Sequence, residues 1–191
     1  MWCDNCLLIF PLRHGAIAWN VFVAAYNLAG SIFLFRSGQF FFFNYPEWQI
    51  YGGIGMAVVA VCVISCIGLS NNTMLWSRVC FYLWPIILIT VAVRDAFMMF
   101  QLDRQQGKII WECNNGGLLW GQSAEKGYGS STSTMPSGVC SAGFHSLYIA
   151  FVLSLLFDYA AQLYAYFMMW RFCQRLQRYD LISNSNKYYY G

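Results

Sequence analysis

The sequence predicts an all-α membrane protein: a bundle of four transmembrane helices with a disulfide-closed exoplasmic loop between the third and fourth helices. Hydrophobic residues make up 59% of the chain and charged residues 10%, which departs from the balance of a soluble domain. Four apolar stretches lack the polar face of a soluble helix, and each is close to the ~20 residues that cross a ~30 Å hydrocarbon layer. These stretches are Gly15–Phe35, Tyr51–Ser70, Val79–Gln101 and Leu147–Trp170.

The chain therefore divides into a juxtamembrane segment, a membrane bundle and a tail. We expect residues 1–14 to lie on the cytoplasmic side, residues 15–170 to form the bundle with its exoplasmic loop at 102–143, and residues 171–191 to form a basic tail. A length of 191 residues leaves no room for a separate soluble domain. The formal net charge of +3 is too small to suggest nucleic-acid binding. No cleavable signal peptide is recognisable, so the first span is expected to act as an uncleaved insertion signal.

Basic residues beside the spans predict that both termini face the cytoplasm. The second connection carries Arg78, whereas the first connection offers only Arg36. The tail adds a basic cluster of Arg171, Arg175, Arg178 and Lys187. Because basic residues near spans stay on the cytoplasmic side, this bias places both termini there. We expect a multi-pass protein of the plasma membrane or the secretory pathway. The three tail arginines share one helical face, where we expect them to contact lipid phosphates or a partner.

The N-terminal segment contains the pair Cys3 and Cys6 in a CxxC arrangement. A zinc site needs about four ligands, and no second pair is present. A redox role needs a thioredoxin-like setting, which is absent. Enzymes similar to vitamin K epoxide reductase carry a CxxC late in the chain, on the exoplasmic side. S-palmitoylation, with Cys173 as a third candidate, and unmodified thiols are the two better interpretations.

Small residues in the first two spans predict close helix packing. Ala25 and Ala29 are four residues apart in the first span, as are Gly53 and Ala57 in the second. In lipid, where no hydrophobic force draws helices together, small residues at this spacing allow backbones to approach closely.

An aromatic block follows the first span. It consists of Phe40, Phe41, Phe42 and Phe43, with Trp48 shortly after. Large aromatic side chains favour both the headgroup layer of a membrane and the centres of protein interfaces. The block is therefore either a lipid belt or a contact surface for another membrane protein.

Charged residues inside the spans are Arg94, Asp95 and Asp158. At ~1.5 Å per residue, Arg94 lies about 22 Å up the third span and Asp158 about 18 Å up the fourth, so their side chains can meet. Asp95 lies about 100° round the helix from Arg94 and is expected to point elsewhere. Because an unpaired charge at this depth is costly, the sequence predicts an Arg94–Asp158 ion pair. The pair either fixes helix packing or relays protons.

Cys113 and Cys140 are the cysteines of the third connection, which changes abruptly to Gly, Ser and Thr. On the oxidising side of the membrane these thiols can pair, which would restrict the unfolded chain by ~3–4 kcal/mol in the entropic account. The alternative is two unpaired thiols.

Catalytic and cofactor motifs are scarce. His14 and His145 lie at opposite membrane faces, so no bis-His haem can form between them. The sequence contains no P-loop, GxSxG or HExxH motif. We expect no cofactor, no metal and no catalytic residues.

The layout resembles MARVEL-type tetraspans of fungal plasma membranes. The resemblance rests on four spans with cytoplasmic ends, the Cys113 and Cys140 loop, Arg94-Asp95 in the third span and the basic exit from the fourth. It is also similar to small four-span subunits of fungal lipid and cell-wall polysaccharide synthases. Both resemblances imply a non-enzymatic protein that organises a membrane region or serves as an accessory subunit. Its expected partners are membrane lipids and either an integral membrane protein or further copies of itself. The alternative is a small transporter or redox enzyme that uses Arg94 and Asp158 or the Cys3/Cys6 pair.

Overall fold

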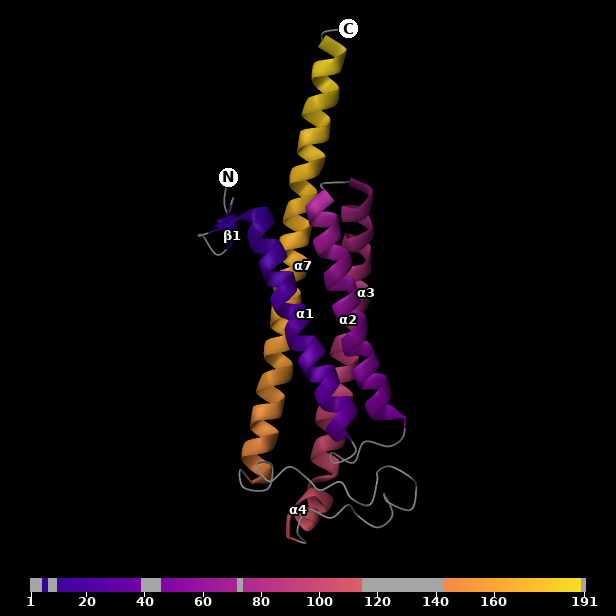
Figure 1. Ribbon diagram of the computed structural model, residues 1–191, viewed down its shortest axis with the longest axis vertical. Coiled ribbons are helices and arrows are strands. Elements are labelled where there is room, and N and C mark those ends of the chain that lie inside the picture. Colours follow the sequence, from indigo (N-terminus) through magenta and orange to yellow (C-terminus); the bar gives the residue numbers. More distant parts are fainter. Residues whose placement is uncertain (1–4, 7–9, 39–45, 72–73, 115–142, 190–191) are drawn as a thin grey trace. The chain divides into compact units, whose positions relative to one another are not determined.

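A computed structural model describes residues 5–6, 10–38, 46–71, 74–114 and 143–189. The elements of these described residues are two short strands and five helices, and Figure 1 labels β1 and each of the helices. The helices are α1 (Leu12–Ser37), α2 (Glu47–Asn71), α3 (Met74–Arg104), α4 (Gln106–Asn114) and α7 (Phe144–Tyr189).

The prediction of four membrane-spanning helices is confirmed for the described residues. Four helices there are long and apolar enough to cross a membrane. Their candidate spans are Arg13–Arg36, Glu47–Asn71, Leu75–Arg104 and Phe144–Arg178. Each helix extends past the apolar stretch predicted for it, because backbone hydrogen bonding continues into polar flanking residues that hydropathy excludes. The extension is largest in α7, which continues to Tyr189.

The N-terminal segment contains a short hairpin. Strand β1 (Asn5–Cys6) pairs antiparallel with β2 (Phe10–Pro11), with Cys6 opposite Phe10. The pairing leads directly into α1. Residues 1–4 and 7–9, including Cys3, lie outside the described part of the chain.

The chain forms two compact units, and each is described separately. Unit 1 comprises Met1–Asn27, Ala57–Ile89 and Tyr159–Gly191, and unit 2 comprises Leu28–Met56 and Thr90–Asp158. Each of the four long helices contributes one segment to unit 1 and one segment to unit 2: α1, α2, α3 and α7.

Two tryptophans join helices within unit 1. The indole Nε1–H of Trp19 on α1 donates to the carbonyl of Ala161 on α7 at 2.9 Å. The Trp19 ring also meets Tyr164 edge-on, with centroids 5.1 Å apart. Trp84 on α3 is fully buried, and its indole N–H donates to the hydroxyl of Ser65 on α2 at 3.1 Å. Each indole thus buries a large ring and still satisfies its polar N–H.

Two further contacts complete a closed ring of helix pairs in unit 1. The Cys173 thiol on α7 donates to the Ser77 carbonyl on α3 at 3.3 Å. The Arg13 guanidinium on α1 donates to the carbonyl of Ser70 in the last turn of α2. That turn has no basic residue of its own, so Arg13 places a positive charge where the helix carbonyls lack intrahelical donors.

We expect Ser65→Ala to destabilise the protein by about 1–3 kcal/mol, because it leaves the buried indole N–H of Trp84 without its acceptor. Thermal unfolding in detergent measures the effect. Ser70→Ala is the matched control, because Ser70 is exposed and only its backbone carbonyl is used. Equal midpoints for the two variants would contradict the role assigned to this hydrogen bond.

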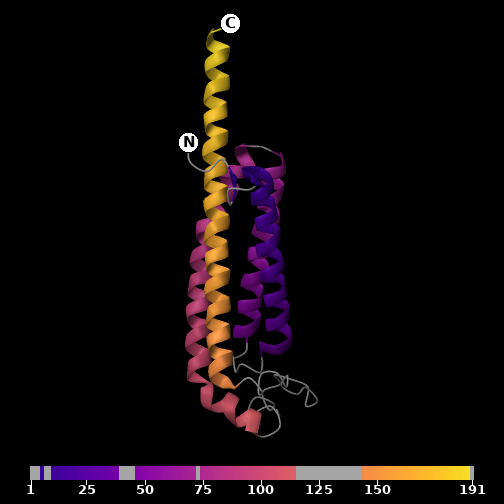
Figure 2. The same cartoon turned by 90° about the vertical axis from the view of Figure 1, so that its left-hand side faces the viewer.

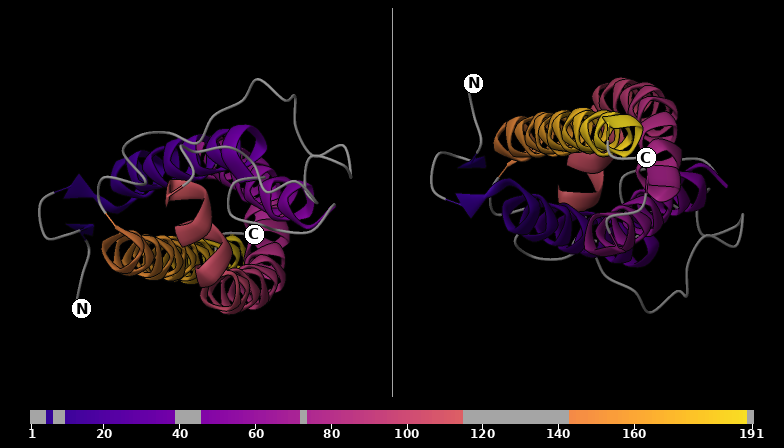
Figure 3. Two further views of the ribbon diagram at one scale, coloured as in Figure 1. Left: turned by 90° about the horizontal axis from the view of Figure 1, so that it is seen from below. Right: turned by 90° about the horizontal axis from the view of Figure 1, so that it is seen from above.

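Unit 2 has an apolar core drawn from all of its helices. The core consists of Leu34 on α1, Tyr51 on α2, Met98 and Leu102 on α3, Ile109 on α4 and Leu155 on α7. α4 turns away from the end of α3 (Figure 2) and lies across the end of this unit (Figure 3, left). Its residue Ile109 joins the core, so α4 closes the end of the core rather than extending α3.

Gly52 of α2 lies close to the Phe35 ring of α1 within unit 2. A Cβ at this position would lie 2.8 Å from the Phe35 ring, a distance at which something must shift. A larger residue at this position would therefore require the Phe35 ring of α1 to move. The sequence predicted close packing at Gly53, which is exposed, with nothing within 4 Å of an added Cβ.

Candidate functional site

The charged residues of the spans meet in unit 2. Arg94 and Asp95 lie on α3 and Asp158 lies on α7, and 4–6% of each residue is exposed. Within the described part of the chain, these are the charged residues that are buried. We refer to them as the charge triad.

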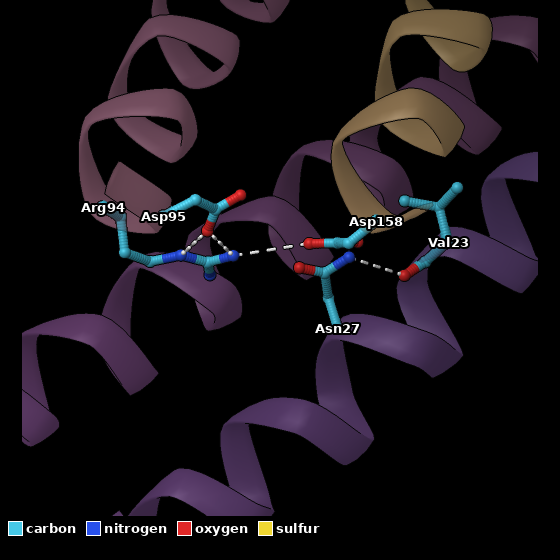
Figure 4. Close-up of polar contacts among 5 residues, drawn as sticks. All are labelled: Val23, Asn27, Arg94, Asp95 and Asp158. Carbon is cyan, nitrogen blue, oxygen red and sulfur yellow. Dashed lines mark hydrogen bonds and ion pairs between the residues drawn. The ribbon is translucent and has the colours of Figure 1, made fainter. Parts of the chain in front are cut away.

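The predicted Arg94–Asp158 ion pair is present. Nη2 of Arg94 lies 3.4 Å from Oδ2 of Asp158. This contact joins α3 to α7 within unit 2, as Figure 4 shows. Counting helical rise from the two ends of the spans was therefore enough to bring these side chains together.

The expectation that Asp95 points away from Arg94 is wrong. Oδ1 of Asp95 accepts from Nε of Arg94 at 3.0 Å and lies 2.9 Å from Nη2. These contacts are shorter than the one to Asp158. The long arginine side chain folds back along its own helix, which overcomes the angular separation of the two Cα positions. Asp95 is thus the nearer of the two carboxylates.

The charge triad has one base and two acids. The guanidinium of Arg94 lies between the two carboxylates (Figure 4), and its Nη2 is shared by both. Oδ2 of Asp95 is a buried atom with no hydrogen-bond partner within the described residues. Full ionisation would leave an excess negative charge in a buried position, which is costly without compensation.

Buried amides on α1 form a polar feature that sequence reasoning missed. Nδ2 of Asn20 donates to the carbonyl of Ala16 at 2.8 Å, and Nδ2 of Asn27 donates to the carbonyl of Val23 at 3.1 Å. The second of these bonds is drawn in Figure 4. The signal was present, because Asn20 and Asn27 are seven residues apart and so share one helical face. Bonding back to the preceding turn lets an apolar span bury an amide.

The small residues predicted to pack lie on outward faces. Ala25 and Ala29 on α1, and Gly53 and Ala57 on α2, are all exposed. They are therefore not where these helices pack in the described bundle segments. Periodicity places such residues on one face, but it does not say whether that face meets a neighbour within the chain.

The aromatic block lies mainly outside the described residues, which exclude Phe40, Phe41, Phe42 and Phe43. Trp48 is described, is half-buried and packs against the core of unit 2. A Cβ on Gly38 would lie 2.9 Å from Cβ of Trp48. Trp48 thus contributes to packing within unit 2, and its contact with a partner or with lipid stays a prediction.

Cysteine environments differ between the two units. Within the described residues, Cys62, Cys66, Cys80 and Cys173 carry thiols that form no disulfide, and all four belong to unit 1. Burial of Cys173 and its bond to Ser77 count against its lipidation. Cys113 is not among these thiols, and Cys140 lies outside the described residues, so their pairing stays a prediction.

The basic exit of the fourth span is helical. Arg171 and Arg175 are half-buried and Arg178 is exposed, all on α7. Their spacing of four and three residues places them on one face, as predicted. Within the described part of the chain, no group of three or more His, Cys, Asp or Glu residues could hold a metal ion.

Comparison with known proteins adds nothing to this site. No family model matches the chain, and no curated protein or solved structure matches it.

Proposed function

We propose that this chain is a non-enzymatic tetraspan membrane protein that acts through lateral helix contacts. It organises a membrane region or serves as an accessory subunit of a larger membrane enzyme, such as a lipid or cell-wall polysaccharide synthase. The resemblance to MARVEL-type tetraspans implies the same class of function.

The observation that carries the proposal is the outward placement of small residues at helix-packing spacing. The pairs Ala25/Ala29 and Gly53/Ala57 are exposed, and nothing lies within 4 Å of a Cβ added at Gly53. Contacts among the described residues therefore leave these faces of α1 and α2 uncovered. Small residues at this spacing permit a second helix to approach closely in lipid. The faces suit another membrane helix, from a partner or from a second copy.

The rest of the outward surface also suits lateral contacts within a membrane. Large apolar side chains point away from the helix contacts, as in Leu75 at 71% and Ile89 at 67% exposed. The buried charged side chains of the described residues, by contrast, pair with one another. This arrangement offers an apolar exterior to lipid or protein and leaves few groups for catalysis.

We expect Gly53→Leu to reduce association with the partner or with further copies several-fold, while the thermal midpoint stays close to that of the wild type. The leucine would fill the space that a second helix needs, and nothing lies within 4 Å of its Cβ position. Purification in mild detergent, followed by identification of copurifying proteins and measurement of mass, tests this.

Val63→Leu is the matched control, because Val63 is exposed on the same helix and already bulky. Unchanged copurification and mass in Gly53→Leu would refute lateral contact through this face. A single large partner in the wild type identifies a subunit, and self-association alone identifies a scaffold.

A disulfide between Cys113 and Cys140 would close the proposed exoplasmic loop between α4 and α7. Cys113 lies in the last turn of α4 and packs against the core of unit 2, as does Phe144 at the start of α7. Gly143, immediately before α7, has a φ of 75°, which suits glycine at the point where the chain enters the helix. Both ends of the segment 115–142 are thus anchored on the same core, and Cys140 lies four residues before Phe144.

A small proton-coupled transporter is the second candidate, and one observation favours it over a redox enzyme. The charge triad contains a second carboxylate, Asp95, that an ion pair with a purely structural role does not need. Cys3 lies outside the described residues, and the structure describes no side chain at Cys6. Flux measurements on the protein in sealed vesicles with an imposed proton gradient would detect transport, and Asp95→Asn should abolish it.

A further inference from the structure

We propose that the charge triad binds one exchangeable proton, held at Oδ2 of Asp95. The inference goes beyond the proposed lateral contacts, because a bound proton requires no partner. It rests on the number of charges in the triad, on the geometry around Arg94 and on the surroundings of Asp95.

The charge count calls for a compensating positive charge. One guanidinium faces two carboxylates, and all three residues are buried. Both ion pairs use Nη2 of Arg94, so a single positive charge serves the two carboxylates. An excess charge at this depth in a membrane is costly, and a buried carboxyl group that is not compensated takes up a proton.

The geometry selects Asp95 Oδ2 as the binding atom. Oδ1 of Asp95 already accepts from Nε and Nη2 of Arg94. Oδ2 of the same carboxyl group is buried and has no hydrogen-bond partner within the described residues. A proton taken from water forms an O–H bond at this oxygen, leaves Oδ1 available to Arg94 and makes the triad neutral. Its release returns the proton to water, with no electron transfer.

Among the described side chains of unit 2, no other ionisable group supplies the compensating positive charge in a buried position. These groups are Arg36 on α1, Glu47 and Tyr51 on α2, Asp103 and Arg104 on α3, and His145 and Tyr148 on α7. Arg36, Arg104 and His145, the basic members, are exposed. Tyr51 belongs to the apolar core with Leu34 and Met98.

A metal ion fits this position poorly. Hard cations such as Mg²⁺ or Ca²⁺ take about six or more oxygen ligands. Within the described residues, no cluster of His, Cys, Asp or Glu could supply such a set. A proton needs a single oxygen.

Infrared spectroscopy of the full chain in phosphatidylcholine vesicles tests the proposal. At neutral pH we expect the carbonyl stretch of a protonated carboxyl group, and we expect it to disappear reversibly at alkaline pH. Asp95→Asn should lose the band. Asp103→Asn is the matched control, since Asp103 is exposed on the same helix, and should keep it. Absence of the band from the wild type at neutral pH, or its persistence in Asp95→Asn, would overturn the proposal.

Conservative variants locate the proton and guard against misfolding. Asp95→Glu should keep the band but shift its frequency, because the protonated group itself has changed, whereas Asp158→Glu should leave the frequency unchanged. The reverse result would place the proton on Asp158 and refute the assignment. The band is read without any partner present, so its loss would not bear on the lateral contacts, and failed copurification would not bear on the proton.

Discussion

Replacing Arg94 with methionine is expected to destabilise the protein by about 3–5 kcal/mol, and more than replacing either Asp95 or Asp158 with leucine. Without Arg94, two buried carboxyl groups lose their shared cation. Without either aspartate, one guanidinium and one carboxylate remain and still form an ion pair. Of the three variants, Arg94→Met should therefore be the least stable, although each variant removes one member of the same cluster.

Thermal unfolding in mild detergent measures this order. Arg104→Met is the matched control, because Arg104 is exposed on the same helix, and it should leave the midpoint nearly unchanged. If Arg94→Met is no more destabilising than Asp158→Leu, Arg94 does not serve both carboxylates, and the description of a shared guanidinium is wrong.

Combined variants separate the triad from the ion pair that the sequence predicts. For an isolated Arg94–Asp158 pair, replacing both residues with apolar ones should restore much of the stability that a single change loses. In the structure the double variant still contains Asp95, whose carboxyl group is neutral when protonated but has lost its contacts to Arg94. We therefore expect partial recovery in the double variant and full recovery only when Asp95→Leu is added, which removes the last buried polar group of the triad. Full recovery in the double variant would show that Asp95 does not depend on Arg94.

The second large effect is expected from the loop between α4 and α7. Replacing both Cys113 and Cys140 with serine should lower stability by ~3–4 kcal/mol, because the unfolded chain then regains the freedom that a cross-link removes. Adding a reductant to the wild type should lower its unfolding midpoint similarly, and should leave the double variant unchanged. The described thiols of unit 1 are Cys62, Cys66, Cys80 and Cys173, and they offer the reductant no disulfide to reduce.

Thiol labelling of the intact, unreduced protein gives an independent readout. Cys113 and Cys140 should be modified only after reduction. Modification of either residue without reductant would show that the loop is open.

The sequence was sufficient for properties that depend on a single segment. The four spans follow from the length and apolarity of each stretch, which a membrane requires whatever the other helices do. The described residues contain four helices that are long and apolar enough to cross a membrane. The Arg94–Asp158 contact also followed, because helical rise fixes the depth of each residue within its own span.

Only the tertiary structure decided which faces meet. Hydropathy in a span is high on every side, so it gives no sign that Gly52 contacts Phe35 while Gly53 faces outward. Periodicity groups small residues on one face, but whether that face packs within the chain depends on the rotation of neighbouring helices.

The role of Asp95 shows the same limit at the site. Its Cα direction differs from that of Arg94, and backbone geometry alone predicts divergence. The guanidinium nevertheless reaches back to Oδ1 of Asp95 and across to Asp158. A long side chain in a low-dielectric interior moves to where opposite charge is available, because leaving either carboxylate unpaired costs more than bending the side chain. The sequence thus determined that charges are buried, and packing decided how they are shared.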